Sequence, residues 1–463
     1  MPRGFRALLL VTAALAAAGH LAAELAPEAT AKIDASAERA LADSGTPSAS
    51  LAVVKDGQLA YVKAYGKARL EPMTPASAEM RYSIGSVSKQ FLAAAILLLV
   101  EDRKLSLDDN VARYLPGLTR AHEITVRQLL SHTSGYQDYY PLDYVAPFMR
   151  KPVTANEILD RWARKPLDFD PGTRWQYSNT NYVAAGRIIE QVTGAPLMTF
   201  LQARIFRPLG MQTVMDLVQA PLNPSDAAGY TRFALGPLRP AAPEGRGWLF
   251  AAGELAMTAR DLALWDLALI QHKILKPASL DTMMTPVRLR NGAPSGYALG
   301  VGVADANGHP RLQHGGAVSG FVSRNTVWPD EGAAVVVLAN VDGSSAPGDI
   351  TDRIAPLLLA EVEDPRATRE LERARRILEG LREGSIDRSL LTSDADAYFT
   401  PGVLADAAAS LKPLGDPKSF RQTSVELRGG MTYRHFEIGF QSKSVHLTTF
   451  TTTDGKLAQY LIQ

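Results

Sequence analysis

The feature that most constrains the fold is an unbroken apolar run, FLAAAILLLV, at positions 91–100. Its ten residues are too few to span a bilayer as a helix, which needs about 20. The run is apolar on every helical face, so it predicts a helix buried in the core of a globular domain. Lys89 stands two residues before the run, and Ser86 stands three residues before the lysine.

Strand patterns at both ends of the chain enclose a helical middle. SASLAVVKDGQLAYVKAYGKA (48–68) predicts two strands around an Asp-Gly turn. Helical patterns and Pro/Gly-rich loops follow as far as about residue 270, and strand patterns return in YALGVGVA (297–304), NTVWP (325–329) and AAVVVLANV (333–341). We therefore expect an α+β fold in which an antiparallel sheet takes strands from both ends, with flanking helices and a helical lobe.

A second, smaller unit is predicted after the main one. We place the main domain at residues 27–362 and a small α+β domain at 363–463. The latter combines a charged helical segment, DPRATRELERARRILEGLREG, with one short helix in DADAYFTPGVLADAAASLKPLG and two hairpins. The hairpins are expected to turn at Gly429–Gly430 and at Asp454–Gly455.

The N-terminus has the pattern of a secretory signal peptide. Arg3 and Arg6 precede an apolar stretch at 7–18, and small residues follow. We assign residues 1–23 to the signal and expect a periplasmic or secreted protein with no stable membrane span after cleavage. The alternative is a short membrane anchor that is never cut.

Composition excludes several functional classes. The chain has no cysteine, which rules out disulfides, thiolate metal sites and a cysteine nucleophile. Lys and Arg number 49 against 48 Asp and Glu, and no basic run with interleaved aromatics occurs, so we expect no nucleic-acid partner. The eight histidines include no His-Glu-x-x-His cluster, so we expect neither a metal nor a cofactor. Ser86 lies outside any Gly-x-Ser-x-Gly elbow of the α/β-hydrolase type.

Ser86 and Lys89 are suited to nucleophilic catalysis. Residues three apart on a helix share a face, so the hydroxyl and the amine can meet. A hydroxyl needs a base before it attacks a carbonyl, and a lysine serves only when it is neutral. Burial and the positive end of the helix dipole both lower a lysine pKa, and free N–H groups at a helix start could bind an oxyanion. The alternative is a helix cap followed by a lysine that reaches solvent.

Two further stretches add candidate residues. Tyr177 and Asn179 lie in the stretch RWQYSNTNYVAAGRIIEQVTG. The Tyr177 phenol could relay the serine proton, and the Asn179 amide could hold a substrate carbonyl. RLQHGGAVSGFVSRNTVWP contains His314, Gly315 and Gly316, in which the glycines let a substrate approach the strand and the histidine could donate a hydrogen bond or charge. The alternatives are a turn with a packed tyrosine and a Gly-Gly turn with a solvated histidine.

In this order, Ser-x-x-Lys, Tyr-x-Asn and a basic residue with glycine resemble the motifs of the serine β-lactamase and DD-peptidase family. Within it the match is to the class C β-lactamase-like branch, with its D-aminopeptidases, DD-carboxypeptidases and family VIII esterases. The supporting stretches span roughly residues 45 to 345: RYSIGSVSKQFLAAAI, ITVRQLLSHTSGY, YSNTNYVAAGRIIEQVTG, PLGMQTV, AGELAMTARDLALW and HGGAVSGFVS. The C-terminal segment resembles an NTF2-like cone domain in DADAYFTP, LKPLGDPKSF and TDGKLAQYL.

The resemblance implies a β-lactamase/transpeptidase-like fold and roles for these residues. Ser86 would be the acylated nucleophile, Lys89 its proton acceptor, and Tyr177 the shuttle that carries the proton to the leaving group and later activates water. Asn179 would orient the substrate. The oxyanion hole would be formed by the backbone N–H groups of Ser86 and Ala317, whereas we interpret the histidine of LLSHTSG, at position 132, as structural.

One departure from the family pattern bears on the substrate. His314 and Gly315 stand where the family has the lysine and threonine of Lys-Thr-Gly, which weakens recognition of a substrate carboxylate. We therefore expect an extracytoplasmic serine hydrolase that cleaves an ester or amide of a small molecule or short peptide through an acyl-enzyme. The alternatives are a β-lactamase or penicillin-binding DD-carboxypeptidase, and a penicillin- or peptidoglycan-binding protein with little turnover; peptidoglycan is a further candidate partner.

Overall fold

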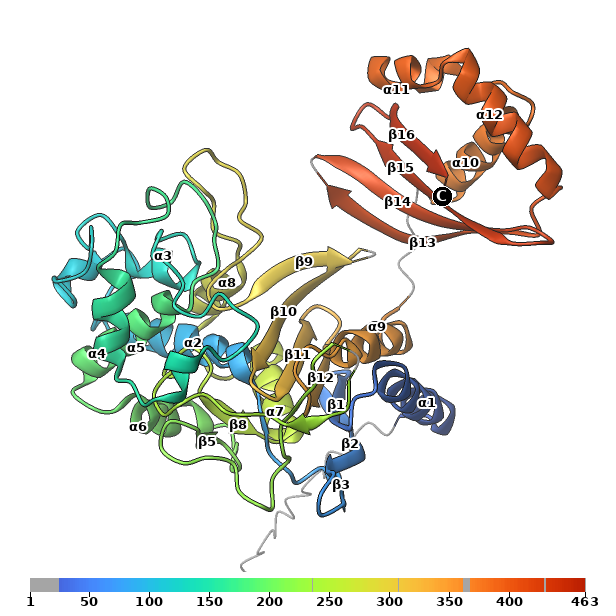
Figure 1. The fold of residues 1–463 in the computed structure, drawn as a ribbon. Coiled ribbons are helices and arrows are strands. Elements are labelled where there is room, and N and C mark those ends of the chain that lie inside the picture. Colours follow the sequence, from blue (N-terminus) through green and yellow to red (C-terminus); the bar gives the residue numbers. More distant parts are fainter. Residues whose placement is uncertain (1–24, 235, 307, 361–366, 429, 463) are drawn as a thin grey trace, which may run out of the picture.

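The computed structural model describes residues 25–234, 236–306, 308–360, 367–428 and 430–462 (Figure 1). The predicted signal peptide, at residues 1–23, lies outside the described residues. Across the described ranges, no helix has both the length and the apolar character needed to cross a membrane.

The main sheet takes its strands from both ends of the chain, as predicted. In the part of the chain that the structure describes, seven antiparallel strands follow the order β3-β2-β1-β12-β11-β10-β9. Residue Ala49 of β1 pairs with Ala339 of β12, which joins the two ends at the centre of the sheet. The strands are β1 (Ser48–Lys55), β2 (Gln58–Arg69), β3 (Thr74–Pro75), β9 (Gly302–Ala306), β10 (His309–Val318), β11 (Phe321–Trp328) and β12 (Ala333–Ala339).

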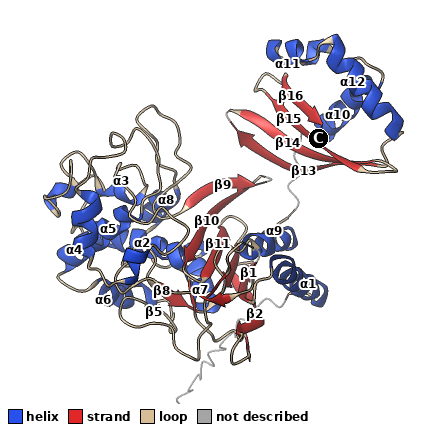
Figure 2. Cartoon of the chain, viewed as in Figure 1, coloured by secondary structure: helices blue, strands red, loops and turns tan. Residues whose placement is uncertain are grey.

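Helices cover both faces of this sheet (Figures 1 and 2). Helices α1 (Pro27–Ser44) and α9 (Ala346–Leu358) pack on one face, where Leu51 and Val53 of β1 join their core. The intervening β1 residues, Ala52 and Val54, face the other side and join the larger core that contains α7 (Ala259–Ile270). This alternation is the period of two that a strand imposes on its side chains.

The apolar run forms the predicted buried helix. Helix α2 (Lys89–Glu101) is buried from Lys89 to Leu99 at the centre of the larger core. Helices α5 (Asn179–Thr193), α6 (Leu197–Leu201) and α8 (Pro277–Met284) pack against it, and α3 (Val126–Leu130) and α4 (Ala155–Ile158) pack against α5. The short helices of other types are η1 (Gly85–Ser88), η2 (Val111–Arg113), η3 (Pro147–Arg150), η4 (Leu159–Ala163), η5 (Gln202–Phe206), η6 (Arg388–Leu390) and η7 (Lys412–Leu414).

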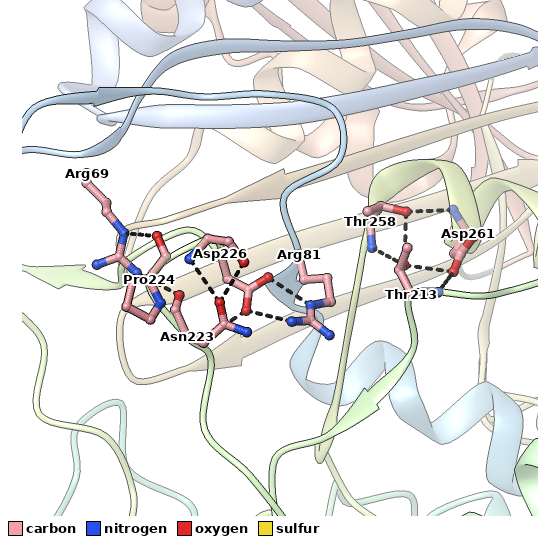
Figure 3. A network of polar contacts seen from close by, with 9 residues as sticks. Arg69, Arg81, Thr213, Asn223, Pro224, Asp226, Thr258 and Asp261 are labelled. Atoms are coloured by element: carbon pink, nitrogen blue, oxygen red, sulfur yellow. Dashed lines mark hydrogen bonds and ion pairs between the residues drawn. The ribbon is translucent and has the colours of Figure 1, made fainter.

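Polar contacts hold the segment that leads into η1 (Figure 3). Arg81 forms two hydrogen bonds with the Asp226 carboxylate, of 2.8 and 2.9 Å. Nearby, the Thr258 hydroxyl caps α7 and joins Thr213 and Asp261 in one network. Five short strands complete this region: β4 (Tyr82–Ser83), β5 (Met215–Asp216), β6 (Tyr230–Thr231), β7 (Arg239–Pro240) and β8 (Leu255–Met257).

Two local predictions are wrong. The stretch 297–304 becomes a strand only at Gly302, because Gly300 adopts a positive φ of 76° and packs against the Lys89 backbone, where an added Cβ would lie 2.6 Å from the carbonyl oxygen. DADAYFTPGVLADAAASLKPLG forms two helices, α11 (Ser393–Tyr398) and α12 (Pro401–Leu411), because Thr400 caps a new helix that begins with a proline.

The C-terminal unit has its own apolar core and sheet. Within the described residues, α10 (Ala367–Arg382) packs with an antiparallel sheet of β13 (Ser419–Arg428), β14 (Met431–Gly439), β15 (Ser444–Thr451) and β16 (Leu457–Ile462). Both predicted hairpins are present, with Arg428 paired to Met431 and Thr451 to Leu457; Gly429 itself lies outside the described residues. The α+β fold class is confirmed, whereas the boundary at 362–363 falls on undescribed residues and stays a prediction.

Candidate active site

Ser86 lies in η1, the short 3-10 turn between β4 and α2, rather than in α2 itself. Side chains three residues apart eclipse one another in a 3-10 turn, so Ser86 and Lys89 face the same side. The Lys89 Nζ is 2.9 Å from the Ser86 Oγ. Gly85 enters the turn with a positive φ of 51°, a conformation that glycine adopts without strain. The predicted serine–lysine contact is therefore present.

The Lys89 amine is enclosed by hydrogen-bond acceptors. Its side chain is 0% exposed, and its Nζ donates to Asn179 Oδ1 at 2.8 Å and to the Ala252 carbonyl at 2.6 Å. Burial lowers the pKa of Lys89 to about 7, against the opposing attraction of Asp138. When the amine is neutral, its two hydrogens satisfy these two acceptors, and the remaining electron pair faces the Ser86 hydroxyl.

Tyr177 stands beside the same amine. The Lys89 Nζ is 5.0 Å from the centre of the Tyr177 ring, and the phenol interacts with the Ser86 hydroxyl. Burial raises the pKa of Tyr177, which the hydrogen bond to Ser86 partly opposes, so the phenol keeps its proton at neutral pH. The ring packs on His132 at 4.3 Å between centroids, and the buried Nδ1 of that histidine accepts from the Ser178 N–H, in keeping with a structural role.

Asn179 is the first residue of α5, and Asp138 holds it there. The Asp138 carboxylate accepts from the Asn179 backbone N–H at 2.9 Å and from Asn179 Nδ2 at 3.2 and 3.3 Å. The sequence-based predictions did not include Asp138, because it lies in a loop without periodicity. The Ala252 carbonyl was also missed, since a backbone acceptor leaves no side-chain signal.

The end of β10 approaches the Ser86 turn closely. The pairing of β9 with β10 ends at Gln313, and the following residues of β10 lie against η1. A Cβ added to Gly85 would lie 3.0 Å from the Ala317 backbone nitrogen. This proximity brings the amides of Ser86 and Ala317 into one region, as an oxyanion hole requires. Gly316 is needed for the approach, because its Cβ would lie 2.0 Å from the Ile84 carbonyl oxygen.

His314 lies at the site, but the expected contribution of charge is wrong. Its Nδ1 donates to the Gly315 carbonyl at 2.6 Å, so the neutral ring has its electron pair on Nε2, which accepts from the Tyr297 hydroxyl at 2.8 Å. Burial lowers the pKa of His314 to about 3, with the Lys89 charge acting in the same direction. The imidazole is therefore neutral and engaged at both nitrogens, and it supports the wall beside Tyr177.

Comparison with known proteins agrees with this geometry. Residues 33–359 match the family model described as Beta-lactamase, which is more than half of the chain. The chain belongs to the Beta-lactamase family. Membership of this family places the chain among serine hydrolases that act on ester or amide bonds.

Two curated relatives illustrate the range of similar proteins. A putative penicillin-binding protein PbpX from Bacillus subtilis (strain 168) is 27% identical over 309 residues, which cover 67% of this chain and 74% of PbpX. A D-aminopeptidase from Brucella anthropi is 28% identical over 306 residues, which cover 65% of this chain. The matched region spans 57% of that D-aminopeptidase, little more than half of its length.

Solved structures of other proteins show the same fold. A D-stereospecific amidohydrolase from Streptomyces sp. aligns with a TM-score of 0.62 and 28% identity, covering 72% of this chain and 99% of that one. D-amino acid amidase from Ochrobactrum anthropi SV3 aligns with a TM-score of 0.64 and 26% identity, covering 71% and 98%. A penicillin-binding protein homologue from Pyrococcus abyssi, at 21% identity, shares the fold over 94% of this chain with a TM-score of 0.64.

Proposed function

We propose that this protein is an extracytoplasmic hydrolase of the class C β-lactamase-like branch, which cleaves esters or amides through an acyl-enzyme on Ser86. The observation that carries the proposal is the contact between a serine hydroxyl and a buried lysine whose pKa is about 7. A base with a pKa near the working pH combines the deprotonated form with enough basicity to take a proton. The extracytoplasmic part is supported by the signal-like sequence at residues 1–23.

In the first step, Lys89 takes the Ser86 proton while Oγ forms a bond to the substrate carbonyl carbon. The carbonyl oxygen becomes an oxyanion, and the backbone N–H groups of Ser86 and Ala317 stabilise it. Tyr177 then passes a proton to the leaving amine or alcohol and regains one from the Lys89 ammonium. The carbon–nitrogen or carbon–oxygen bond breaks, leaving an ester on Ser86 and a neutral amine on Lys89.

The second half repeats these transfers with water. A water molecule loses a proton toward Tyr177 and Lys89 as its oxygen attacks the acyl carbon. The bond from that carbon to Ser86 Oγ then breaks, and Oγ recovers the proton. The carboxylic acid product leaves, and each residue returns to its starting protonation state.

The charges at the site favour a substrate without a carboxylate near the scissile bond. His314 is neutral, and Gly315 has no hydroxyl to offer a carboxylate. Asp138 brings a negative charge instead, which would repel an anionic substrate. Simple esters and D-amino-acid amides have no carboxylate at this position and therefore fit the site. The names of the D-aminopeptidase and D-amino acid amidase relatives support D-amino-acid amides.

The test is a substrate panel with the wild type and Ser86→Ala. The panel contains p-nitrophenyl butyrate, a D-amino-acid amide, a D-Ala-D-Ala peptide and nitrocefin. We expect hydrolysis of the first two, and a loss of about 10³-fold or more in Ser86→Ala. Ser36→Ala, which removes an exposed hydroxyl on α1, is the control and should keep the wild-type rate. Equal rates for Ser86→Ala and the wild type would reject the acyl-enzyme.

The PbpX relative favours a second candidate, a penicillin-binding protein with little turnover. Such a protein would be acylated on Ser86 without efficient deacylation. A labelled penicillin that stays attached to Ser86 for hours, with no hydrolysis of esters or amides in the panel, would favour this candidate over the first.

A further inference from the structure

Asp138 occupies an unusual place between the start of a helix and the catalytic lysine. Its carboxylate accepts the first backbone N–H of α5 and the side-chain Nδ2 of the same residue, Asn179. The adjacent Tyr140 N–H donates to it at 3.0 Å. A negative charge at a helix N-terminus is favourable, so the carboxylate and the α5 start stabilise one another.

The carboxylate fixes which end of the Asn179 amide faces Lys89. A carboxylate can only accept hydrogen bonds, so the Asn179 group that contacts it must be the NH₂. The Oδ1 then points to the Lys89 Nζ, at 2.8 Å. If the amide were reversed, its oxygen would face the Asp138 carboxylate, and these two acceptors would repel each other. Its NH₂ would face Lys89 and could form a hydrogen bond only by using the electron pair of the amine.

The direction of that electron pair decides whether Lys89 can act as a base toward Ser86. A neutral amine has two hydrogens and one electron pair. With the Ala252 carbonyl and Asn179 Oδ1 as obligate acceptors, both hydrogens are used, and the pair is left for the Ser86 hydroxyl at 2.9 Å. A reversed Asn179 would draw the pair toward its own NH₂ and away from the serine.

We propose that Asp138 is a positioning residue for this reaction, which holds the Asn179 amide in one orientation and thereby aims the Lys89 electron pair at Ser86. This inference rests on the proposed function, because it gives Lys89 the role of base. It adds a residue that acts through Asn179 and Lys89 rather than on the substrate.

Asp138 also sets the electrostatic environment of Lys89. The titratable groups that face the amine are Asp138 and His132 from the loop after α3, Tyr177 and Tyr182 at α5, and His314 on β10. Burial lowers the pKa of both histidines and raises the pKa of both phenols, so these four groups are neutral at pH 7. Burial raises the pKa of Asp138 as well, but the N–H groups of Tyr140 and Asn179 and the charge of Lys89 oppose this effect. Among these facing groups, Asp138 supplies the charge, and its attraction raises the pKa of Lys89 against the effect of burial.

The test compares pH profiles of kcat/KM for Asp138→Asn and the wild type. Loss of the charge should lower the Lys89 pKa, so the acid limb moves to lower pH. The plateau should fall by about 10²-fold, because an asparagine accepts either orientation of Asn179 and misplaces the base. A merely structural loosening would admit water to Lys89 and move the limb to higher pH. Asp138→Glu keeps the charge and should return the limb to near its wild-type position.

The matched control is Asp143→Asn, which removes the same charge from an exposed position five residues further along the loop and should leave the profile unchanged. If Asp138→Asn does not fold, Asp138→Ser carries the same test. NMR titration of Lys89 in ¹³C-lysine-labelled protein follows the pKa without turnover, so it distinguishes this inference from the proposed function. A wild-type limb and plateau in Asp138→Asn, with Ser86→Ala inactive, would overturn the inference alone.

Discussion

A Cβ atom added to Gly316 would lie 2.0 Å from the Ile84 carbonyl oxygen and 2.4 Å from the Ser323 hydroxyl. The first of these is a backbone atom, so β10 would have to move away from the Ser86 turn. We predict that Gly316→Ala lowers kcat/KM by about 10²- to 10³-fold, because the Ala317 N–H no longer aligns with the oxyanion. Steady-state kinetics and the thermal midpoint together measure the effect.

Gly348→Ala, in α9, is the control for this prediction. A Cβ added at that position would have no heavy atom within 4 Å. Its rate should stay within a few-fold of wild type, and equal losses in both variants would contradict a special role for the Gly316 contact.

Lys89 should make the rate and the stability depend on pH in the same direction. The rate should rise with pH through about 7, as the amine becomes neutral. Between that value and the ordinary lysine pKa of about 10.4, the unfolded chain binds more protons than the folded one, so stability also rises with pH. Urea unfolding of the wild type and of Lys89→Met at pH 7 and pH 9.5 checks this.

We expect the inactive Lys89→Met protein to lack this component of the pH dependence. The stability of the wild type relative to Lys89→Met should therefore increase between the two pH values. If the difference in unfolding free energy between the two proteins is the same at both pH values, burial does not lower the pKa of Lys89.

Tyr177→Phe should separate chemistry from packing. The phenylalanine keeps the ring contact with His132, so the free energy of unfolding should change by about 1 kcal/mol or less. Without the hydroxyl, proton transfer to the leaving group is lost, and kcat should fall by about 10²- to 10⁴-fold. Thermal unfolding and single-turnover kinetics measure the two effects, and a stable variant with a wild-type kcat would exclude Tyr177 from the proton path.

The Arg81–Asp226 pair should stabilise the fold except in acid. Burial is the largest single effect and raises the pKa of Asp226, but the hydrogen bonds from Arg81 and the Asn223 N–H, together with the Arg81 charge, outweigh it, so the net pKa is lowered. The stabilisation is therefore complete above the unfolded pKa of about 3.9 and is lost as the pH falls through the lower folded value. Asp226→Ala should lower the free energy of unfolding by about 2 kcal/mol at pH 7, with a smaller difference at pH 3.

Asp43→Ala provides the comparison for this pair. Asp43 forms exposed contacts with Arg39 and Arg353, which contribute little in water. Denaturant curves should show a change of about 0.5 kcal/mol or less for it. A comparable loss in the two variants would mean that the Arg81 pair is no stronger than a surface contact.

Periodic features of the sequence predicted the fold, and fixed spacings predicted the serine–lysine contact. The alternation in β1 and the apolar run of α2 show which side chains are buried, and these patterns can be read without knowing the tertiary contacts of the chain. Asp138 could not be predicted, because its role depends on a loop meeting the start of α5. The neutrality of His314 likewise depends on Tyr297, a partner 17 residues earlier that spacing does not reveal.

The pairing of Ala49 with Ala339 has a consequence for how this protein matures. The centre of the sheet cannot assemble until nearly 300 residues beyond β1 have emerged, and such non-local pairing is slow to form. Ser86 and Lys89 are synthesised early, whereas β10, which lies against the Ser86 turn, is synthesised more than 200 residues later. A nascent chain therefore has no complete oxyanion pocket, which delays hydrolytic activity until β10 to β12 have joined the sheet.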